Sequence, residues 1–433
     1  MLNNYLRPKK AEALCRLYEK PLERKTHLQV WRGAGIILPS LDHRNRSMGN
    51  KGGVVDEQGK FVGLSAINDE CRAYPVDGIG GVMDQRVVYC GYFPMHWGHF
   101  LTEVVCRLWY ALDHDDEVEK YIFTVRPGFE TKMHGNMRSF FDALGILEKV
   151  ELTSKPAVYR EIIVPELCYK TCEYKSDAYL RMFDKVKENL LTAAASEKTE
   201  KKEKIFLSRS RFLKKSGKTE AGTELLDDFF SRNGYQIIYP EEYSLAGLTR
   251  LLHEAKECAT TEGTISHNIL FAPESLSVVI VEREAWLNTY QIGLNRLRPW
   301  QITHVDAHYS LYPTEMGFGP YLIAFTKEFQ QFAADRGFEP PSPEFVGEAY
   351  LRRCFQTYMS AYFEQHGYQW KMSGITADAD YLYESYESGC EVFGPYLRRE
   401  KPFKISQYFQ PHYWRKMLGR MRRGENRIVL RKK

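Results

Sequence analysis

The chain has 433 residues, of which 43% are hydrophobic and 27% are charged, and its net charge is +4. This composition excludes fibrous and disordered classes, and the length predicts two or three domains. Nine irregularly spaced cysteines without a CxxC pair favour a reducing compartment over a disulfide framework. The N-terminus lacks the apolar segment of a signal peptide, and no run has the length of a membrane span. We therefore expect a soluble, cytoplasmic protein.

Residues 1–195 are expected to form a first lobe with a β-rich start. Short apolar runs at 28–31, 35–39 and 86–90, separated by glycine-rich turns, predict strands there. The pattern then predicts a helix over 94–113, a strand at 120–125, a helix at 133–144, a strand at 161–165 and a helix at 176–194. Such alternation predicts a parallel sheet covered on both faces.

A charged linker at 196–204 is predicted to lead into a second lobe over 205–314. Strands are predicted at 204–208, 235–240, 257–261 and 276–282, with helices at 220–232, 244–255 and 265–271. The fold class is therefore α/β, with two Rossmann-like lobes that face a cleft. Ligands of such sheets bind at the carboxyl ends of the strands.

Residues 315–433 are expected to form a mostly helical extension. Its end, 401–433, contains eleven Lys and Arg residues against one acidic residue, Glu425. Over 407–424 the apolar residues recur at helical spacing between basic ones, which is typical of a helix on an anionic membrane surface. A surface helix that packs on the protein body is the alternative. No aromatic-interleaved RNA motif accompanies the basic residues, so no nucleic acid is expected as a partner.

A stripe of polar residues is predicted on the helix over 94–113. Spacings of three and four place His96, His99, Glu103 and Arg107 along one side, which suits a general base or a sugar-binding edge. An ordinary Glu103–Arg107 ion pair beside hydrogen-bonded core histidines is the alternative. A metal site is less favoured, because no further ligand follows at a known spacing.

Two segments of the second lobe suit phosphate binding. The strand at 204–208 ends in Ser208-Arg209-Ser210-Arg211, and two guanidiniums at a strand end can chelate a diphosphate. The strand at 257–261 runs through Glu262-Gly263-Thr264 into a predicted helix that begins with Ser266-His267-Asn268. A glycine turn before a helix N-terminus presents free N–H groups to phosphate oxygens.

Four motifs in this order resemble glycosyltransferase family 61, over about residues 85–285. They are HWGHFLTEVVCRLW (96–109), LSRSR (207–211), YPEEYSL (239–245) and EGTISHNILFAPES (262–275). The family includes bacterial capsular-polysaccharide transferases and is similar to GT-B enzymes. The resemblance implies a GT-B-like fold and an inverting transfer that needs no metal.

The resemblance also implies roles for individual residues. Arg209 and Arg211 would hold the donor diphosphate, and Glu242 would lie near the nucleotide or its ribose. The phosphate-facing turn would comprise Gly263, Thr264, Ser266 and Asn268, and the acceptor side would be lined by His99 and Glu103. Many members read His-Gly-Ala-Gly where this chain has Glu262-Gly263-Thr264-Ile265. His267 is the candidate to replace that histidine, while Glu262 and His96 are candidates to contact the sugar.

These observations predict a glycosyltransferase that moves a hexosyl or pentosyl group from a nucleotide-sugar to a glycan or lipid-linked glycan acceptor, such as a capsular polysaccharide. Glu103, or alternatively His99, would deprotonate the acceptor hydroxyl. No metal or other cofactor is expected, and the protein would be cytoplasmic or peripheral on the inner face of the membrane. The alternative is a non-catalytic protein that binds nucleotide-sugar or polysaccharide and retains the fold.

Overall fold

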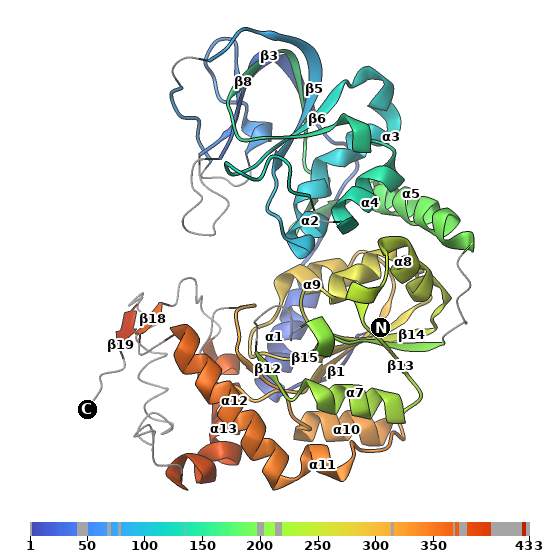
Figure 1. The fold of residues 1–433 in the computed structure, drawn as a ribbon, viewed down its shortest axis with the longest axis vertical. Coiled ribbons are helices and arrows are strands. Elements are labelled where there is room, and N and C mark those ends of the chain that lie inside the picture. The colour runs from blue at the N-terminus through green and yellow to red at the C-terminus, as the bar shows by residue number, and fades with distance from the viewer. Residues whose placement is uncertain are drawn as a thin grey trace. The chain divides into compact units, whose positions relative to one another are not determined.

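The computed structural model describes residues 2–40, 51–66, 71–76, 79–133, 135–196, 203–212, 219–312, 316–366, 369–371, 379–399 and 427–429 (Figure 1). The chain forms two compact units. We call Pro21–Thr199 with Ser244–Arg250 the N-terminal unit, and Met1–Lys20 with Glu200–Tyr243 and Leu251–Lys433 the C-terminal unit. The N-terminal segment 1–20 therefore belongs to the C-terminal unit.

A six-stranded parallel sheet forms the centre of the C-terminal unit, in the order β1-β16-β15-β14-β11-β13. The strands are β1 (Leu2–Tyr5), β11 (Lys204–Leu207), β13 (Gln236–Ile238), β14 (Glu257–Thr261), β15 (Ser277–Glu282) and β16 (Gln301–Asp306). The predicted parallel sheet is confirmed here. The two strands at one side, β1 and β16, were not predicted.

Helices cover this sheet through aromatic and aliphatic contacts. Phe230 of α7 (Thr223–Arg232) stacks on Phe206 of β11, with ring centroids 4.4 Å apart, and Phe332 of α10 (Lys327–Asp335) meets Tyr5 of β1 edge-on. Elsewhere, α1 (Pro8–Glu19) packs in one apolar cluster with Ile292 of α9 (Thr289–Asn295). The unpredicted helix α1 begins at a proline, which suits the first helical turn.

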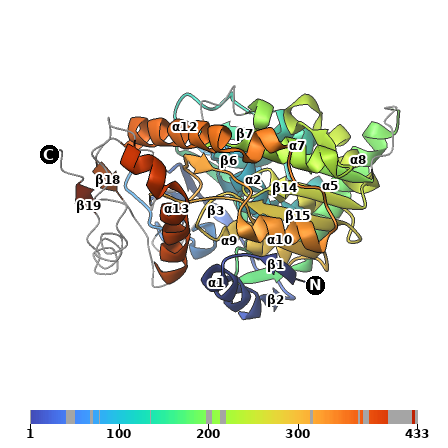
Figure 2. The same ribbon diagram turned by 90° about the horizontal axis from the view of Figure 1, so that it is seen from below.

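The predicted helical extension packs onto the same core. Its described helices are α11 (Pro343–Val346), α12 (Glu348–His366) and α13 (Ala379–Arg399). Phe355 of α12 and Phe393 of α13 are stacked and lie in one buried cluster with Phe229 of α7. In addition, α13 contacts α1, as can be followed in Figure 2. Two short sheets complete the unit: β12 (Glu220–Ala221) with β17 (Tyr321–Leu322), and β18 (Gln369–Lys371) with β19 (Arg427–Val429).

The N-terminal unit contains a mixed sheet in the order β4-β3-β8-β5-β6-β7. Its strands are β3 (Val30–Leu38), β4 (Gly53–Asp56), β5 (Met83–Tyr92), β6 (Lys120–Thr124), β7 (Val150–Thr153) and β8 (Ala157–Pro165). The last four in this order pair in parallel, but β3 is antiparallel to both β4 and β8. The parallel sheet predicted from the alternating strands and helices is confirmed for these four strands, and the antiparallel β3 and β4 come from the β-rich start of the chain. A small sheet of β2 (Glu23–Lys25), β9 (Tyr169–Lys170) and β10 (Tyr174–Ser176) is also present.

The predicted continuous helix over 94–113 is also wrong. It is divided into α2 (Trp97–Thr102), the 3-10 helix η2 (Val104–Tyr110) and α3 (Ala111–His114). The break falls at Glu103, whose φ of −132° is not helical. Two predicted helices are confirmed in this unit, α4 (Gly135–Leu144) and α5 (Asp177–Ala193), and α8 (Leu245–Glu254) is confirmed as well. The remaining 3-10 helices are η1 (Gly63–Ser65), η3 (Asp115–Glu117), η4 (Leu147–Lys149), η5 (Ala194–Ser196), η6 (Pro240–Glu242) and η7 (Ser266–Phe271).

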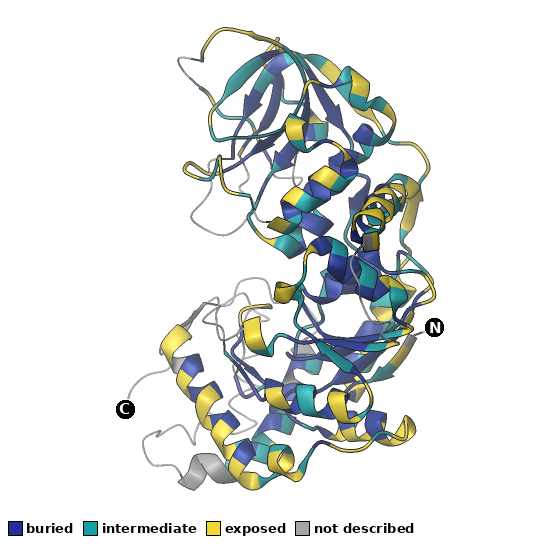
Figure 3. Ribbon diagram, turned by 45° about the vertical axis from the view of Figure 1, so that its right-hand side comes forward, coloured by how far each residue is buried: buried dark blue, intermediate teal, exposed yellow. Residues whose placement is uncertain are grey.

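The membrane prediction concerns the basic C-terminal residues. The predicted basic helix over 407–424 lies outside the described residues, so its role stays a prediction. Within the described part of the chain, no helix combines the length and the apolar character needed to cross a membrane. Figure 3 shows the strands largely buried and the outward faces of the helices exposed.

A buried ammonium joins the N-terminal segment to the sheet. The side chain of Lys10 in α1 is fully buried and donates to Asp306 Oδ1 at 2.8 Å, to the Glu284 carbonyl at 2.9 Å and to Glu282 Oε2 at 3.4 Å. Arg7 adds a backbone N–H bond to Asp306 Oδ2 at 3.0 Å. Burial by itself would lower the pKa of Lys10, but Asp306 and Glu282 outweigh it and raise that pKa.

We expect Lys10→Met to lower the free energy of unfolding by about 3–5 kcal/mol, because Glu282 and Asp306 lose a buried counter-charge, which Arg7 replaces only at Asp306, while the apolar stem is kept. Urea denaturation at neutral pH measures this change. The matched control is Lys9→Met, because Lys9 is exposed, whereas the adjacent Lys10 makes the buried contacts. Equal effects of the two substitutions would contradict the assigned role of Lys10.

Candidate functional site

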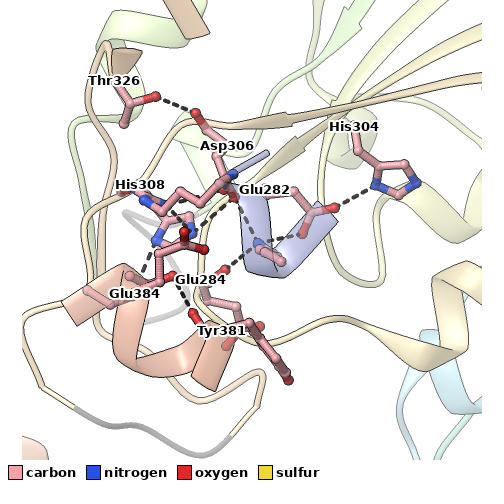
Figure 4. Close-up of polar contacts among 12 residues, drawn as sticks. Glu282, Glu284, His304, Asp306, His308, Thr326, Tyr381 and Glu384 are labelled. Atoms are coloured by element: carbon pink, nitrogen blue, oxygen red, sulfur yellow. Dashed lines mark hydrogen bonds and ion pairs between the residues drawn. The ribbon is translucent and has the colours of Figure 1, made fainter. Parts of the chain in front are cut away.

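Polar and charged side chains follow the carboxyl ends of four neighbouring strands in the C-terminal unit. They are Ser208 and Arg209 after β11, Glu262 and Gly263 after β14, Arg283 and Glu284 after β15, and His308 after β16. Because parallel strands end at one edge of the sheet, these residues gather there, where ligands of α/β sheets bind. Figure 4 shows part of this edge, with Glu282, Asp306 and His308 close together.

One buried carboxylate, Glu220 of β12, joins two arginines. Its Oε1 accepts from Arg209 Nε at 3.1 Å and from Arg283 Nη1. Arg283 also lies over the ring of Tyr321, 4.2 Å from its centroid, and Tyr321 is the register partner of Glu220 in the β12–β17 pair. Burial and then the charge of Arg283 lower the pKa of Arg209. Two guanidiniums thus share a single carboxylate and retain an excess of positive charge.

Gly263 makes room for Arg283. A Cβ atom at this position would lie 2.6 Å from Arg283 Nη2, closer than real Cβ contacts, and the φ of Gly263 is +114°. Glycine is therefore required by the close approach of a guanidinium as well as by the turn. Arg283 was not predicted, although it follows a predicted strand as Arg209 does. Thr264, the next predicted residue, is partly buried.

The predicted helix after this turn is the short 3-10 element η7. The N–H groups of Ser266, His267 and Asn268 donate to the carbonyls of the three residues at 263–265. The hydroxyl of Ser266 and Nδ1 of His267 both bond to Gln291 Oε1, at 2.6 and 2.7 Å. The side chain of Asn268 donates to a carbonyl of the turn, at residue 265. These predicted residues therefore stabilise the turn itself, and their N–H groups are already donated within it.

Arg211 lies apart from the shared carboxylate. Its guanidinium pairs with Glu242 and lies over the ring of Tyr239, 3.8 Å from the centroid. Both partners of this ion pair are about half exposed. The structure thus places Arg211 beside Glu242 of η6. However, Arg209 and Arg211 have different partners. Arg209 instead shares the Glu220 carboxylate with Arg283.

Glu262 is buried at the same edge. Among the residues that the structure describes, neither of its carboxylate oxygens has a hydrogen-bond partner. Burial, followed by the charges of Glu282 and Glu284, raises the pKa of Glu262 well above its usual range. This shift favours the neutral acid, which carries no charge that would repel a diphosphate.

Further titratable groups surround the Lys10 ammonium. Burial opposes ionisation of Glu282, but Lys10 and the bond from His304 Nδ1, at 2.7 Å, lower its pKa to about 2. Burial lowers the pKa of His308 to about 4, against the pull of Asp306. Burial raises the pKa of Glu284 to about 7, against the charge of Arg283.

The histidines predicted in the N-terminal unit form a small cluster at α2. His99 Nδ1 bonds to Glu103 Oε2 at 2.7 Å, and this bond raises the pKa of His99. His96 precedes α2, and its Nδ1 accepts from the backbone N–H of His99 at 3.5 Å. Arg107 is buried and donates to the carbonyl of Leu64 at 2.6 Å. Because the helix breaks at Glu103, Glu103 and Arg107 do not have the i,i+4 geometry that the alternative ion pair requires.

Among the described residues, no group of three or more His, Cys, Asp or Glu side chains is arranged to hold a metal ion. Asp113 and Asp115 instead pair with Arg181 and Lys149. The expectation of transfer without a metal stays a prediction.

We expect Glu284→Gln to become increasingly stabilising, relative to the wild type, as the pH rises from 5 to 8. The folded state keeps the Glu284 proton up to about pH 7, whereas an unfolded glutamate loses it near pH ~4.3. Stability from this group therefore falls as the pH rises through that window, by roughly 2–3 kcal/mol. Denaturation curves across this range measure the difference, with exposed Glu344→Gln as control. A pH-independent difference between Glu284→Gln and the wild type would contradict the shifted pKa.

Comparison with known proteins places part of this chain in a family. Residues 97–280 match the family model described as Glycosyltransferase 61. No curated protein matches the chain. Similar solved structures include a family 9 glycosyl transferase from Veillonella parvula DSM 2008, with 8% identity over 65% of this chain and 98% of that one and a TM-score of 0.24. Another is the iron-containing dodecameric glycosyltransferase TibC of enterotoxigenic E. coli H10407, with 8% identity over 79% and 98% and a TM-score of 0.27.

At such TM-scores these two likenesses carry no argument, and the assignment rests on the family match. That match begins one residue after His96 and includes the Arg209 strand end, Glu220 and the Gly263 turn. The resemblance seen in the four sequence motifs is thereby confirmed, and the chain carries a glycosyltransferase family 61 domain over residues 97–280.

Proposed function

We propose that this glycosyltransferase takes a sugar from a nucleotide-sugar donor and transfers it to a glycan acceptor by a single, inverting displacement. The observation that carries the donor assignment is the pair Arg209 and Arg283, which share the buried carboxylate of Glu220 at the carboxyl edge of a parallel sheet. A diphosphate offers the negative charge that this pair lacks.

The donor would be held as follows. Arg209 and Arg283 bind the diphosphate and stabilise the charge that develops when the bond to the anomeric carbon breaks. The exposed pair of Arg211 and Glu242 contacts the nucleotide. Neutral Glu262, which stands where many family members have histidine, contacts hydroxyl groups of the sugar.

The acceptor would be activated by the His99–Glu103 pair of the N-terminal unit. The acceptor hydroxyl loses its proton to this pair and attacks the anomeric carbon, while the electron pair of the broken bond leaves with the nucleoside diphosphate. Glu103 can accept the proton itself, or it can orient His99 through the 2.7 Å bond to Nδ1. His96 would contact the sugar edge of the acceptor. In this proposal the protein groups replace a divalent cation.

The remaining predictions concern the fold organisation, the substrates and the membrane attachment of the protein. A GT-B-like organisation, a hexosyl or pentosyl donor, a lipid-linked or capsular acceptor and attachment of residues 401–433 to an anionic membrane all remain part of the proposal. A non-catalytic protein that binds nucleotide-sugar is the second candidate, favoured by Glu262 in place of the family histidine. Binding without turnover over a broad acceptor panel would support it.

We expect Arg209→Ala and Arg283→Ala each to weaken donor binding by roughly 10- to 100-fold, because each removes a charge-assisted contact. Thermal shift against UDP-, GDP-, CMP- and dTDP-sugars identifies the nucleotide, and calorimetry in EDTA then measures affinity. Arg211→Ala, at an exposed pair, should have a smaller effect, and Arg232→Ala, an exposed arginine of α7, should have none. Binding or activity that needs added Mn²⁺ would contradict metal independence. Unchanged affinity in both main variants would exclude this arginine pair as the diphosphate site.

We expect Glu103→Gln to lower kcat by roughly 10²- to 10⁴-fold while leaving donor affinity unchanged, because a general base acts in the chemical step. Initial rates at saturating donor measure this effect. The control is Glu117→Gln, since Glu117 also bonds to a histidine Nδ1, that of His114, at 2.9 Å and similar exposure. Normal turnover of Glu103→Gln, together with loss in His99→Ala, would make His99 the base, and normal turnover of both would remove this pair from the mechanism.

A further inference from the structure

Two amide side chains on one face of α9 occupy the buried space behind the Gly263 turn. Gln291 and Asn295 are four residues apart, so they lie on the same side of the helix, and both are almost fully buried. Gln291 Nε2 donates to Asn295 Oδ1 at 2.7 Å. This leaves Gln291 Oε1 as the acceptor that faces η7.

The single oxygen Gln291 Oε1 holds two consecutive residues of the turn. It accepts from the Ser266 hydroxyl at 2.6 Å and bonds to His267 Nδ1 at 2.7 Å. Since the oxygen can only accept, the His267 proton lies on Nδ1. Gln291 therefore sets the tautomer of His267, and together with the Gly263 carbonyl, also 2.6 Å from the Ser266 hydroxyl, it holds the side chain of Ser266. It also supports the turn whose glycine accommodates Arg283.

A chain of hydrogen bonds continues from Asn295 to the N-terminal segment. Asn295 Nδ2 lies 3.3 Å from His304 Nε2, which must then accept. His304 Nδ1 in turn donates to Glu282 Oε1 at 2.7 Å, and Glu282 Oε2 accepts from Lys10 at 3.4 Å. Figure 4 shows the His304–Glu282 step of this chain. Along this path Gln291 donates to Asn295, Asn295 to His304 and His304 to Glu282, so the direction of the bonds is consistent from Gln291 to Glu282.

We propose that Gln291 is a positioning residue for the Gly263–Asn268 turn, and that Asn295, His304 and Glu282 couple this turn to Lys10. The N-terminal segment, which precedes the family-matched residues 97–280, thereby helps to set the geometry of the donor site. The coupling is physical because every member of the chain is buried, and a buried polar group that loses its partner forces its neighbours to rearrange. The effect on donor affinity rests on the proposed function, whereas the effect on the turn does not.

The test uses the full-length protein and two readouts, hydrogen exchange of a peptide spanning residues 262–268 and calorimetric affinity for the nucleotide-sugar found by thermal shift. Gln291→Leu removes the acceptor at similar volume. It should speed exchange of this peptide and weaken donor affinity, each by about tenfold, while kcat at saturating donor stays within about twofold. Gln291→Glu keeps an acceptor oxygen for the turn, and it should restore both readouts at an acidic pH where its carboxyl is protonated and can still donate to Asn295 Oδ1. Gln301→Leu, an exposed position on β16, is the control.

The coupling itself is tested by changing the far end of the chain. Lys10→Met, or Asn295→Leu if the former does not fold, should speed exchange at 262–268, and should add little more in a Gln291→Leu background. A lower melting temperature of Gln291→Leu, with exchange and affinity at wild-type values, would overturn the positioning role. Additive effects in the double variant would overturn the coupling. A wild type that binds no nucleotide-sugar contradicts the proposed function instead, and the exchange readout still decides the coupling.

Discussion

The buried ammonium of Lys10 is the interaction on which the C-terminal unit depends. It pairs with Asp306 and Glu282, which end two adjacent strands of the sheet, and Arg7 adds a second cation to Asp306 at 3.3 Å, so loss of Lys10 would leave these buried carboxylates less well compensated in a low-dielectric interior. Because Lys10 lies on α1, the same contact fixes the N-terminal segment, including strand β1. An ionised Glu282 is in turn the acceptor that orients His304. One side chain therefore joins the packing of the N-terminal segment to the hydrogen-bond chain behind the Gly263 turn.

After the neighbouring strands β11 and β15, by contrast, positive charge is in excess. Arg209 and Arg283 compete for one oxygen of Glu220, and burial together with the charges of Glu282 and Glu284 raises the pKa of Glu262, another buried carboxyl at this edge. Glu262 therefore adds little negative charge beside the two arginines. This imbalance is what an anionic ligand would relieve.

Much of the site could be predicted because its residues follow strands with clear apolar patterns. Arg209, Glu262 and Gly263 were found in this way. Arg283 also follows a predicted strand, but it was missed because its neighbours, Glu282 and Glu284, make the segment resemble an ordinary charged turn. The pairing of Arg209 with Arg211 was expected from proximity in sequence, yet residues two apart at a strand end lead to different partners. The helix over 94–113 was over-extended because periodicity does not reveal the break at Glu103.

The sequence by itself determined the α/β class, many of the strands and helices between β6 and β15 and the family resemblance, because these depend on local periodicity and short motifs. Only the tertiary structure decided which charges meet. Lys10 and Asp306 are separated by almost 300 residues, as are β1 and β16, and no local pattern encodes such a contact. The protonation of Glu262 and Glu284 likewise depends on burial and on neighbours from several strands. The proposed donor site therefore has a local part that the sequence reveals and an electrostatic part that arises only when residues from several strands pack together.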